Sequence, residues 1–467
     1  MRYQAGMRES SQQGAAPVVR PIPFADPLTA FAALRGDAMA VLLDSAGEGP
    51  DTGRYCVVAC DPALTIRAEW PDAFDRLDRV LETLPRISAS PEWPIGPGLF
   101  GSFGYELRRG LERVPSRHAR EDGPDDLLLG LFDTVVVFDL IARRAAIIAC
   151  DLVAGRPPAI LRAGLAAQRI AVAPPLPLAD WTQSAEWIAD RSPADYAAQV
   201  SQVLNYIRAG DIYQANFTQR WIAAKPAGLD DFDVYRRLRS LSPAPYGAFV
   251  QDGVGNAIAA ASPERFLKLS PDGRIDTRPI KGTRPRGATA VEDRDLAAAL
   301  SASAKDQAEN LMIVDLLRND LGRVAEAGSV KVPELNALYS FASVHHLVST
   351  VTAKLRTGLG PADLIRASFP GGSVTGTPKI RAMEIIDELE AARRGAYCGA
   401  IGWIGVDGAM ELSIAIRTLT ITKDRVIAQA GGGIVADSDP MNEYQEALTK
   451  ARPMLATLDS RYRRLGD

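Results

Sequence analysis

Residues 247–287, GAFVQDGVGNAIAAASPERFLKLSPDGRIDTRPIKGTRPRG, indicate the fold class of this chain. Short runs of apolar and β-branched residues at 247–251, 256–261 and 265–270 are separated by turn-forming Gly, Asp and Pro, and they lead into a further strand at PIKGT. No regular alternation of strand and helix, as expected for a parallel sheet, occurs here. We therefore predict an α+β fold, with large antiparallel sheets packed between helices.

One lysine stands inside this strand-rich segment. Lys281 is followed within five residues by Arg284 and Arg286. An amine attacks carbon only when neutral, and burial or cationic neighbours lower the pKa of a lysine. A solvated lysine at a strand end is the commoner arrangement. The local sequence by itself leaves both a nucleophile and a surface lysine open.

Composition narrows the class of protein. Of 467 residues, 47% are hydrophobic and 24% charged, and the formal net charge is −4. These values are typical of a soluble globular protein and give no reason to expect nucleic acid or an anionic membrane as partner. Four scattered cysteines and three histidines make a zinc or disulfide framework improbable. With no signal-peptide pattern and no long apolar run, we expect a cytoplasmic protein that binds no membrane.

The chain divides into three parts by sequence. We expect a disordered polar tail at 1–20, a first region at 21–180 rich in β-hairpins, and a second region at 190–467, both regions belonging to one compact unit. The second region opens with an amphipathic helix that Ser192 caps. In the strand that follows, Gln214, Asn216 and Thr218 share a polar face that can line a site.

Two helices carry paired carboxylates. A helix capped by Ser303 places Asp306 and Glu309 on one face, and a helix capped by Asp439 does the same with Glu443 and Glu446, with Lys450 one turn later. Each pair alone is more often a solvated helix face, and Glu446 with Lys450 reads equally as a surface ion pair. Two such helices together suit Mg²⁺, which takes oxygen ligands from few carboxylates, water and an anionic substrate.

Two glycine-rich stretches are candidate anion cradles. GGSVTGTPK at 371–379 precedes a helix that we expect to have Pro378 in its first turn and Ile380, Met383, Ile386 and Leu389 facing inward. It lacks the Gly-Lys-Ser/Thr ending of a P-loop, which argues against nucleotide binding. GGG at 431–433 is either a bend in a strand or a place where backbone N–H groups approach a ligand closely.

Five segments together resemble one family. SPERF at 262–266, PIKGT at 279–283, AENLMIVDLLRND at 308–320, GGSVTGTPK, and GGGIVADS at 431–438 occur in the order found in the chorismate-utilising enzymes, specifically their aminodeoxychorismate synthase component I branch. The match spans about residues 190–455 and continues more weakly through the N-terminal half. The resemblance implies the αββα fold of anthranilate synthase component I.

The resemblance also implies roles for individual residues. Lys281 matches the nucleophile, Glu264 the general acid/base and His346 an active-site histidine. Glu309 and Glu446 match direct Mg²⁺ ligands, whereas Asp306 and Glu443 match acidic positions that act through water. The positions matching contacts to chorismate are Gln214, Thr375, Tyr397, Arg417, Gly431, Gly432, Gly433 and Lys450.

The implied reaction is a transferase reaction of the transaminase class. Chorismate would be aminated at C4 to 4-amino-4-deoxychorismate through a covalent Lys281 adduct at C2, at the entry to 4-aminobenzoate and folate biosynthesis. The chain shows no cysteine nucleophile elbow, since Cys398 lacks the GxCxG frame, so ammonia would come from a separate glutamine amidotransferase subunit, component II. About twenty residues follow Glu446, too few for a fused lyase domain.

Other functions remain as alternatives. Anthranilate synthase component I is the nearest, but that branch is expected to carry alanine in place of Lys281, and isochorismate and salicylate synthases a lysine in place of Gln214. A non-catalytic chorismate-fold protein should have lost acidic ligands, and a pyridoxal-phosphate enzyme would be yellow. The one minor departure within the matching segments is Thr377, where alanine is expected.

The N-terminal half suggests a second ligand. LLDS at 42–45, GRY at 53–55 and PAPY at 243–246 resemble the tryptophan pocket of related synthases. Ser45, Pro243 and Tyr246 could therefore hold an indole amino acid, although such short motifs are equally compatible with ordinary sheet residues.

Overall fold

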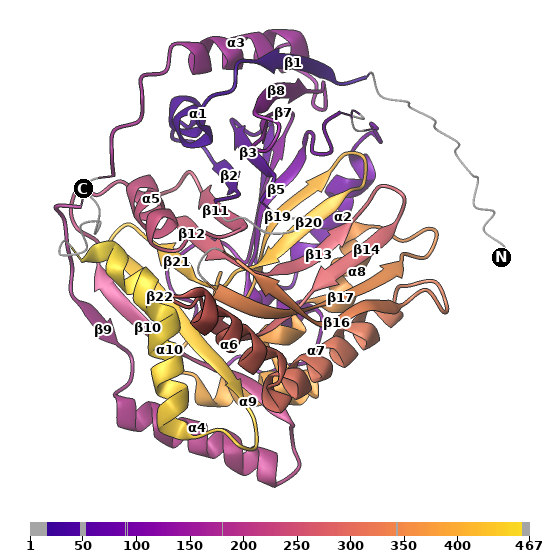
Figure 1. Cartoon of the computed structure of the whole chain (residues 1–467). Helices are drawn as coiled ribbons and strands as arrows, with labels where there is room; N and C mark the ends of the chain where they lie inside the picture. Colours follow the sequence, from indigo (N-terminus) through magenta and orange to yellow (C-terminus); the bar gives the residue numbers. More distant parts are fainter. Residues whose placement is uncertain are drawn as a thin grey trace.

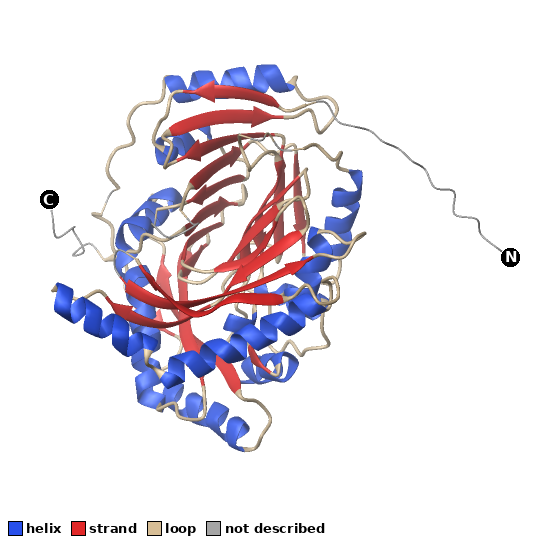
Figure 2. Ribbon diagram, turned by 45° about the vertical axis from the view of Figure 1, so that its right-hand side comes forward, coloured by secondary structure: helices blue, strands red, loops and turns tan. Residues whose placement is uncertain are grey.

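Two large antiparallel sheets form the centre of the molecule. The computed structural model describes residues 16–46, 53–88, 90, 92–179, 181–341 and 344–459. The sheets face each other and helices lie on their outer sides (Figure 2). The α+β prediction with large antiparallel sheets is confirmed.

The larger sheet has twelve strands, with β9 pairing to β10 beside the main path. Its strand order is β1 (Val18–Ile22), β8 (Arg144–Ala149), β7 (Thr134–Asp139), β3 (Tyr55–Cys60), β2 (Ala40–Asp44), β11 (Tyr246–Gln251), β12 (Ala257–Ser262), β21 (Thr418–Ile421), β22 (Arg425–Ile434), β10 (Gln214–Ala224) and β18 (Gly376–Thr377), with β9 at Trp187–Ala189.

The smaller sheet has ten strands, with β16 pairing to β17 beside the main path. Its order is β15 (Ile280–Pro285), β17 (Val344–Lys354), β14 (Arg274–Arg278), β13 (Arg265–Leu269), β20 (Met410–Ile414), β19 (Ala400–Gly405), β5 (Gly98–Phe103), β6 (Leu127–Phe132) and β4 (Leu64–Ala68), with β16 at Lys331–Ser340.

Helices cover the outer faces of both sheets. They are α1 (Pro27–Leu34), α2 (Ala73–Thr83), α3 (Ala159–Ala171), α4 (Pro193–Arg208), α5 (Asp231–Leu241), α6 (Ala290–Ser301), α7 (Ala304–Gly322), α8 (Pro361–Ser368), α9 (Lys379–Leu389) and α10 (Pro440–Leu455), with short 3₁₀ turns η1 (Tyr105–Gly110), η2 (Gly372–Val374) and η3 (Ala456–Leu458). Figure 1 shows α4 and α10 lying across β10 and β22. Among the described helices, none is long and apolar enough to cross a membrane.

The core follows the alternation of side chains along the strands. Val41 of β2 packs between the sheets with Phe100 of β5 and Trp403 of β19. Its neighbour Leu42 points the other way, against Phe31 of α1 and Phe232 of α5. Successive strand residues thus fill an inner core between the sheets and an outer core beneath the helices, as expected for a strand buried on both faces.

Strands from both sequence regions share each sheet. In the larger sheet β2 pairs with β11, and in the smaller sheet β5 pairs with β19. The proline-rich connection before residue 180 therefore joins parts of the same sheets. The chain also crosses from one sheet to the other between β6 and β7, within a segment whose sequence reads as one long apolar run.

Three local predictions were wrong. Residues 18–20, expected to belong to a disordered tail, are in strand β1, where Val18 pairs with Ala149 and Val19 with Ile148 of β8; residues 1–15 lie outside the described part. In α9, Met383, Ile386 and Leu389 are buried as expected, but Ile380 is 44% exposed. Ile380 is exposed because the first turn of α9 lies beside the edge strand β18 and borders a surface groove. Pro378, expected in the first turn, is the residue before the helix.

Candidate active site

A glycine bulge turns Lys281 inward. In the pairing of β15 with β17, Lys281 lies opposite Leu347 and Thr283 opposite His346, so Gly282 is an extra residue with φ of 72°. Bulges of this kind redirect a side chain, and glycine adopts the required conformation without strain. The half-buried Lys281 side chain reaches the 371–377 turn, where its Nζ donates to the carbonyl of Ser373 at 3.4 Å.

The surroundings of Lys281 favour the neutral amine. Burial lowers its pKa and Lys450 lowers it further, against the opposing effect of carboxylates such as Glu309. The sequence suggested Arg284 and Arg286 as the cationic neighbours, and this is wrong. Both guanidinium groups are bound to carboxylates elsewhere, at 3.0 Å and 2.7 Å respectively, because the strand after the bulge turns them toward α6 and α7.

Glu264 lies at the same turn. It follows β12, is only 6% exposed, and has its pKa raised to about 7 by burial. A hydrogen bond with the Ser373 side chain and the nearby charge of Lys281 limit the rise. Ser373 therefore contacts both the candidate acid and the candidate nucleophile. Sequence reasoning missed Ser373 as an individual residue, although it lies in the middle of GGSVTGTPK.

His346 is a neutral imidazole in this pocket. Its Nδ1 lies 2.9 Å from the hydroxyl of Thr283 and 3.3 Å from the carbonyl of Gly282. Burial, and next the charge of Arg417, lower its pKa to about 4. Near pH 7 it therefore serves as an uncharged hydrogen-bonding group. The adjacent His345 instead bridges Ser340 and Asp293, in a structural contact with α6.

Arg417 is a guanidinium without a carboxylate. It has a left-handed backbone, with φ of 50°, and no hydrogen bond or ion pair joins its side chain to another described residue. Burial lowers its pKa, which shows that its charge is poorly compensated. A half-buried unpaired guanidinium suits an anionic ligand, because its planar donors fit a carboxylate.

The glycines of β22 leave no room for side chains. A Cβ at Gly431 would lie 2.0 Å from the carbonyl of Phe217, and a Cβ at Gly433 would lie 2.1 Å from Nε2 of Gln214. Gln214 is 1% exposed, and its Oε1 has no hydrogen-bond partner within the described chain. The GGG segment is thus a strand that approaches neighbouring groups closely, with an unsatisfied amide oxygen beside it.

The acidic side chains of α10 meet at the middle glycine. A Cβ at Gly432 would lie 3.1 Å from Oε2 of Glu443 and 3.3 Å from Oε1 of Glu446. Lys450 Nζ binds Glu446 at 2.7 Å and the carbonyl of Gly431 at 3.0 Å. Burial raises the pKa of Glu443, whereas Lys450 lowers that of Glu446.

Carboxylates from α7 complete this acidic side of the site. Burial raises the pKa of Glu309, and the charges of Asp306 and then Glu446 raise it further, against the opposing charge of Lys281. Asp306 is held by Arg284 at 3.0 Å. In the described ranges, no three His, Cys, Asp or Glu side chains form a metal cluster by themselves. Two converging carboxylates still fit Mg²⁺, which takes its remaining ligands from water and substrate.

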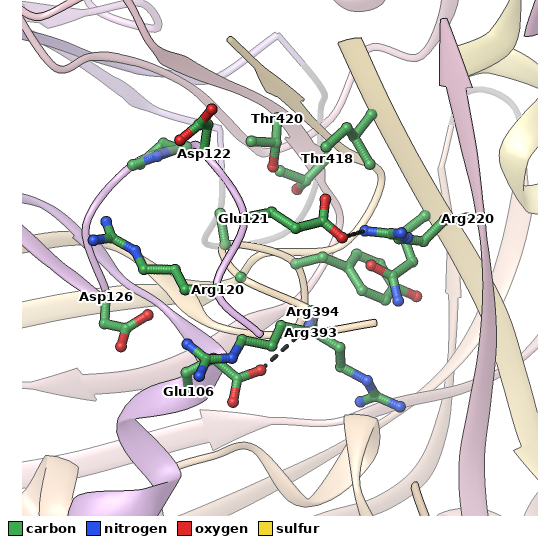
Figure 3. A pocket seen from close by; sticks show the side chains of 17 residues that line it. Glu106, Arg120, Glu121, Asp122, Asp126, Arg220, Arg393, Arg394, Thr418 and Thr420 are labelled. Carbon is green, nitrogen blue, oxygen red and sulfur yellow. Dashed lines mark hydrogen bonds and ion pairs between the residues drawn. The ribbon is translucent and has the colours of Figure 1, made fainter. Parts of the chain in front are cut away.

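Two residues predicted to contact the substrate, Thr375 and Tyr397, make their contacts within the protein. The Thr375 hydroxyl donates within its own turn to the carbonyl of Gly371 at 3.1 Å, and its carbonyl accepts from the amide of Asn216 at 2.7 Å. Tyr397 lines a cavity of about 70 Å³ together with Arg394, Thr418 and Gln429 (Figure 3). Burial raises the pKa of Tyr397, which therefore stays protonated.

A separate cavity of about 640 Å³ lies where the tryptophan pocket was expected. Ser45 and Tyr246 line it, whereas Pro245 takes the place predicted for Pro243. The Ser45 hydroxyl donates to the carbonyl of Tyr55 at 2.8 Å. Residues 47–52, between the two N-terminal motifs, lie outside the described chain.

Comparisons with known proteins show the family of this chain. A family model for chorismate binding enzymes matches residues 40–456. Aminodeoxychorismate synthase component 1 of Klebsiella aerogenes is 41% identical over 446 residues, covering 92% of this chain and 96% of the relative. Anthranilate synthase component 1 of Thermus thermophilus is 38% identical over 450 residues, covering 93% and 95%.

Solved structures show the same fold. Anthranilate synthase component I from Streptococcus pneumoniae TIGR4 superimposes with a TM-score of 0.77 and 32% identity, covering 86% of this chain and 92% of that one. The isochorismate synthase MenF from Escherichia coli shares the fold alone, with a TM-score of 0.72 at 19% identity over 96% of each chain. By the family match over most of its length, this chain belongs to the chorismate binding enzymes.

Proposed function

We propose that this chain aminates chorismate at C4, forming 4-amino-4-deoxychorismate and water. One observation carries the proposal: a lysine amine with a lowered pKa and a carboxyl with a pKa of about 7 both contact Ser373. A nucleophile and an acid side by side are what substitution of a poor leaving group requires. The aminodeoxychorismate synthase relatives, 40–41% identical over most of the chain, support the same activity.

The reaction divides into two substitutions. The neutral Lys281 amine forms a bond to C2, the two conjugated double bonds shift, and the C4–O bond breaks as Glu264 gives its proton to the departing hydroxyl. The proton lost by the amine restores Glu264. Ammonia then forms a bond to C4, the double bonds shift back, and the C2–N bond to Lys281 breaks, with the proton from ammonia passing to the amine.

Other groups bind and orient the substrate. Arg417 and the backbone of Gly431–Gly433 would hold carboxylates of chorismate, and neutral His346 would form hydrogen bonds without adding charge. Glu309 and Glu446 would hold Mg²⁺, with Glu443 hydrogen-bonded nearby. When bound, this ion screens and orients a substrate carboxylate. Asp306, engaged by Arg284, would act only indirectly.

Ammonia would come from a partner subunit. Burial raises the pKa of Cys60, Cys150 and Cys398 to about 12 and that of Cys56 well above its ordinary value, so all four thiols are poor nucleophiles. The relatives are named component 1, which supports a second component. We expect amination from ammonium by the single chain, and amination from glutamine only with an added glutamine amidotransferase.

Anthranilate synthesis is the second candidate, because relatives and a solved structure with 32% identity carry that name. Product identification separates the two. The purified chain with chorismate, Mg²⁺ and ammonium should form 4-amino-4-deoxychorismate, detected by chromatography and mass spectrometry. Anthranilate and pyruvate in its place would contradict the proposal. The product would then enter 4-aminobenzoate and folate synthesis in the cytoplasm.

A further inference from the structure

A buried ion pair lies next to two segments that carry candidate site residues, the 371–377 turn and β10. Arg394 and Glu390 follow α9 and are 4% and 5% exposed. Nη2 and Nε of Arg394 bind the two carboxylate oxygens of Glu390 at 2.7 Å and 2.9 Å. Burying two charges costs so much hydration that apolar residues are often as stabilising. The pair therefore requires a role other than stability.

The remaining donors of Arg394 reach two segments of the site. Nη1 donates to the carbonyl of Val374 at 2.7 Å, and Nη2 donates to the carbonyl of Asn216 at 2.6 Å. Glu390 accepts from the hydroxyl of Thr218 at 2.6 Å. One guanidinium thus joins the 371–377 turn to β10, and its carboxylate partner is itself anchored to β10.

The 371–377 turn is joined to β10 at its end, where β18 pairs with β10 and the Thr375 carbonyl accepts from the amide of Asn216, but its first residues are held only weakly by bonds of their own. Its internal backbone hydrogen bonds, from Val374 to Gly371 and from Thr375 to Gly372, are both 3.3 Å long. Thr375 lies outside the helical and extended regions, at φ −115° and ψ −94°. A turn with such weak internal bonds depends on outside contacts for its position.

Ser373 stands next to the carbonyl that Arg394 holds. Its own carbonyl accepts from Lys281, and its side chain is hydrogen-bonded to Glu264. A shift of the turn would therefore change the positions of both groups at once. Glu264 is also faced by the charges of Lys281 on β15 and Lys450 on α10, and by the amide of Ile280.

We propose that Arg394, oriented by Glu390, is a positioning residue for the reaction. Through the carbonyl of Val374 it holds Ser373 against Lys281 and Glu264, and its side chain also lines the small cavity shown in Figure 3. The inference rests on the proposed function, because it is Lys281 and Glu264, in the roles proposed there, that Arg394 would position.

Arg394→Lys tests the inference. A lysine keeps the charge but cannot bind two carbonyls and a carboxylate with one ammonium. We expect kcat for amination to fall about 100-fold, as a displacement of reacting groups of about 1 Å can do, with little change in KM for chorismate, since the carboxylate contacts remain. In the wild-type enzyme the rate of Lys281 adduct formation should decline above about pH 7, as Glu264 loses its proton. In Arg394→Lys this alkaline decline should be displaced by about one pH unit to higher pH, because Glu264 loses a hydrogen bond to its charged form.

Arg237→Lys is the matched control. Arg237, on the inner side of α5 and away from the site, is as fully buried and donates to the carbonyl of Thr457 at 2.8 Å. This variant should lose thermal stability and leave the alkaline decline in place. Thr218→Val provides a milder change: it removes the hydroxyl that donates to Glu390 and accepts from Gln429, and it leaves Arg394 in place. It should move the decline in the same direction by less.

The outcomes separate the two proposals. The product made by the wild-type enzyme decides the proposed function, whatever the variants do. If wild type makes 4-amino-4-deoxychorismate but Arg394→Lys and Thr218→Val keep the wild-type pH profile, the positioning role is wrong. The positioning role is also wrong if Arg394→Lys raises only KM, or if its kcat falls only in proportion to the fraction of unfolded protein.

Discussion

Replacing Glu264 by glutamine should remove the proton that the C4 hydroxyl needs to leave. Burial raises the pKa of this carboxyl to about 7, so about half of the molecules carry the proton at pH 7. The protonated fraction is about nine-tenths at pH 6 and one-tenth at pH 8. On the alkaline side, the rate of the first substitution should fall about tenfold per pH unit.

Adduct formation without ammonia isolates this step. Enzyme and chorismate are mixed at several pH values and quenched, and the Lys281 adduct, heavier by chorismate minus water, is followed by mass spectrometry. Glu264→Gln cannot act as an acid, so the rate should fall about 10²- to 10⁴-fold. The alkaline decline should also disappear, since no titrating acid remains.

Asp126→Asn is the control for this experiment. Burial, with the nearby charges of Glu69 and Glu106, raises the pKa of Asp126 to about 7 as well, but this carboxyl lines the small cavity of Figure 3. Its replacement should leave the alkaline decline in place. The reasoning fails if Glu264→Gln keeps the decline, or if Asp126→Asn abolishes it.

Stability supplies an independent reading of the same pKa. The folded-state pKa of Glu264 is about 7 against an ordinary value of 4.5, so the folded protein holds a proton that the unfolded chain has lost between these values. The contribution of Glu264 to the free energy of unfolding is therefore present at low pH and is lost as pH rises through about 7. Glu264→Gln should flatten that dependence and raise Tm relative to wild type at pH 8, measured by differential scanning fluorimetry.

Four further outcomes are expected. Lys281→Ala should still bind chorismate in calorimetry but form no adduct. The variant should also unfold at a higher temperature than wild type at neutral pH, because burial penalises the charged amine. Amination by this variant at the wild-type rate would exclude Lys281 as nucleophile. Gly432→Ala should weaken activation by Mg²⁺ about tenfold, because a methyl group would crowd the carboxylates on α10, and unchanged Mg²⁺ titrations would contradict this. Chelation by EDTA should abolish turnover and added Mg²⁺ restore it, so full activity after metal removal would exclude the ion. We also propose that the cavity beside Ser45 binds tryptophan, and millimolar tryptophan with neither heat nor thermal shift would exclude this.

Much of the fold follows from local sequence patterns. The first region contains the expected β-hairpins, such as that of β2 and β3, and the caps at Ser192, Ser303 and Asp439 are as predicted, with Ser192 accepting from the amide of Asp195 at 3.1 Å. These features depend on residues within a few positions of one another. Residues 127–140, LLLGLFDTVVVFDL, do not indicate that β6 and β7 belong to different sheets, because a strand buried in either sheet is apolar on both faces.

The sequence by itself determined the family and supplied the candidate groups of the site, because the motifs that carry Lys281, Glu264, His346 and the acidic pairs are continuous segments. Only the tertiary structure decided which charges meet. Burial lowers the pKa of Lys281, and the cation that adds to this effect is Lys450, from a helix 169 residues further along the chain, and not the adjacent arginines. A turn that Arg394 contacts brings Ser373 to both Lys281 and Glu264. The physical reason is that burial and charge act through space over a few ångströms, and the sheets bring together residues that the sequence keeps far apart.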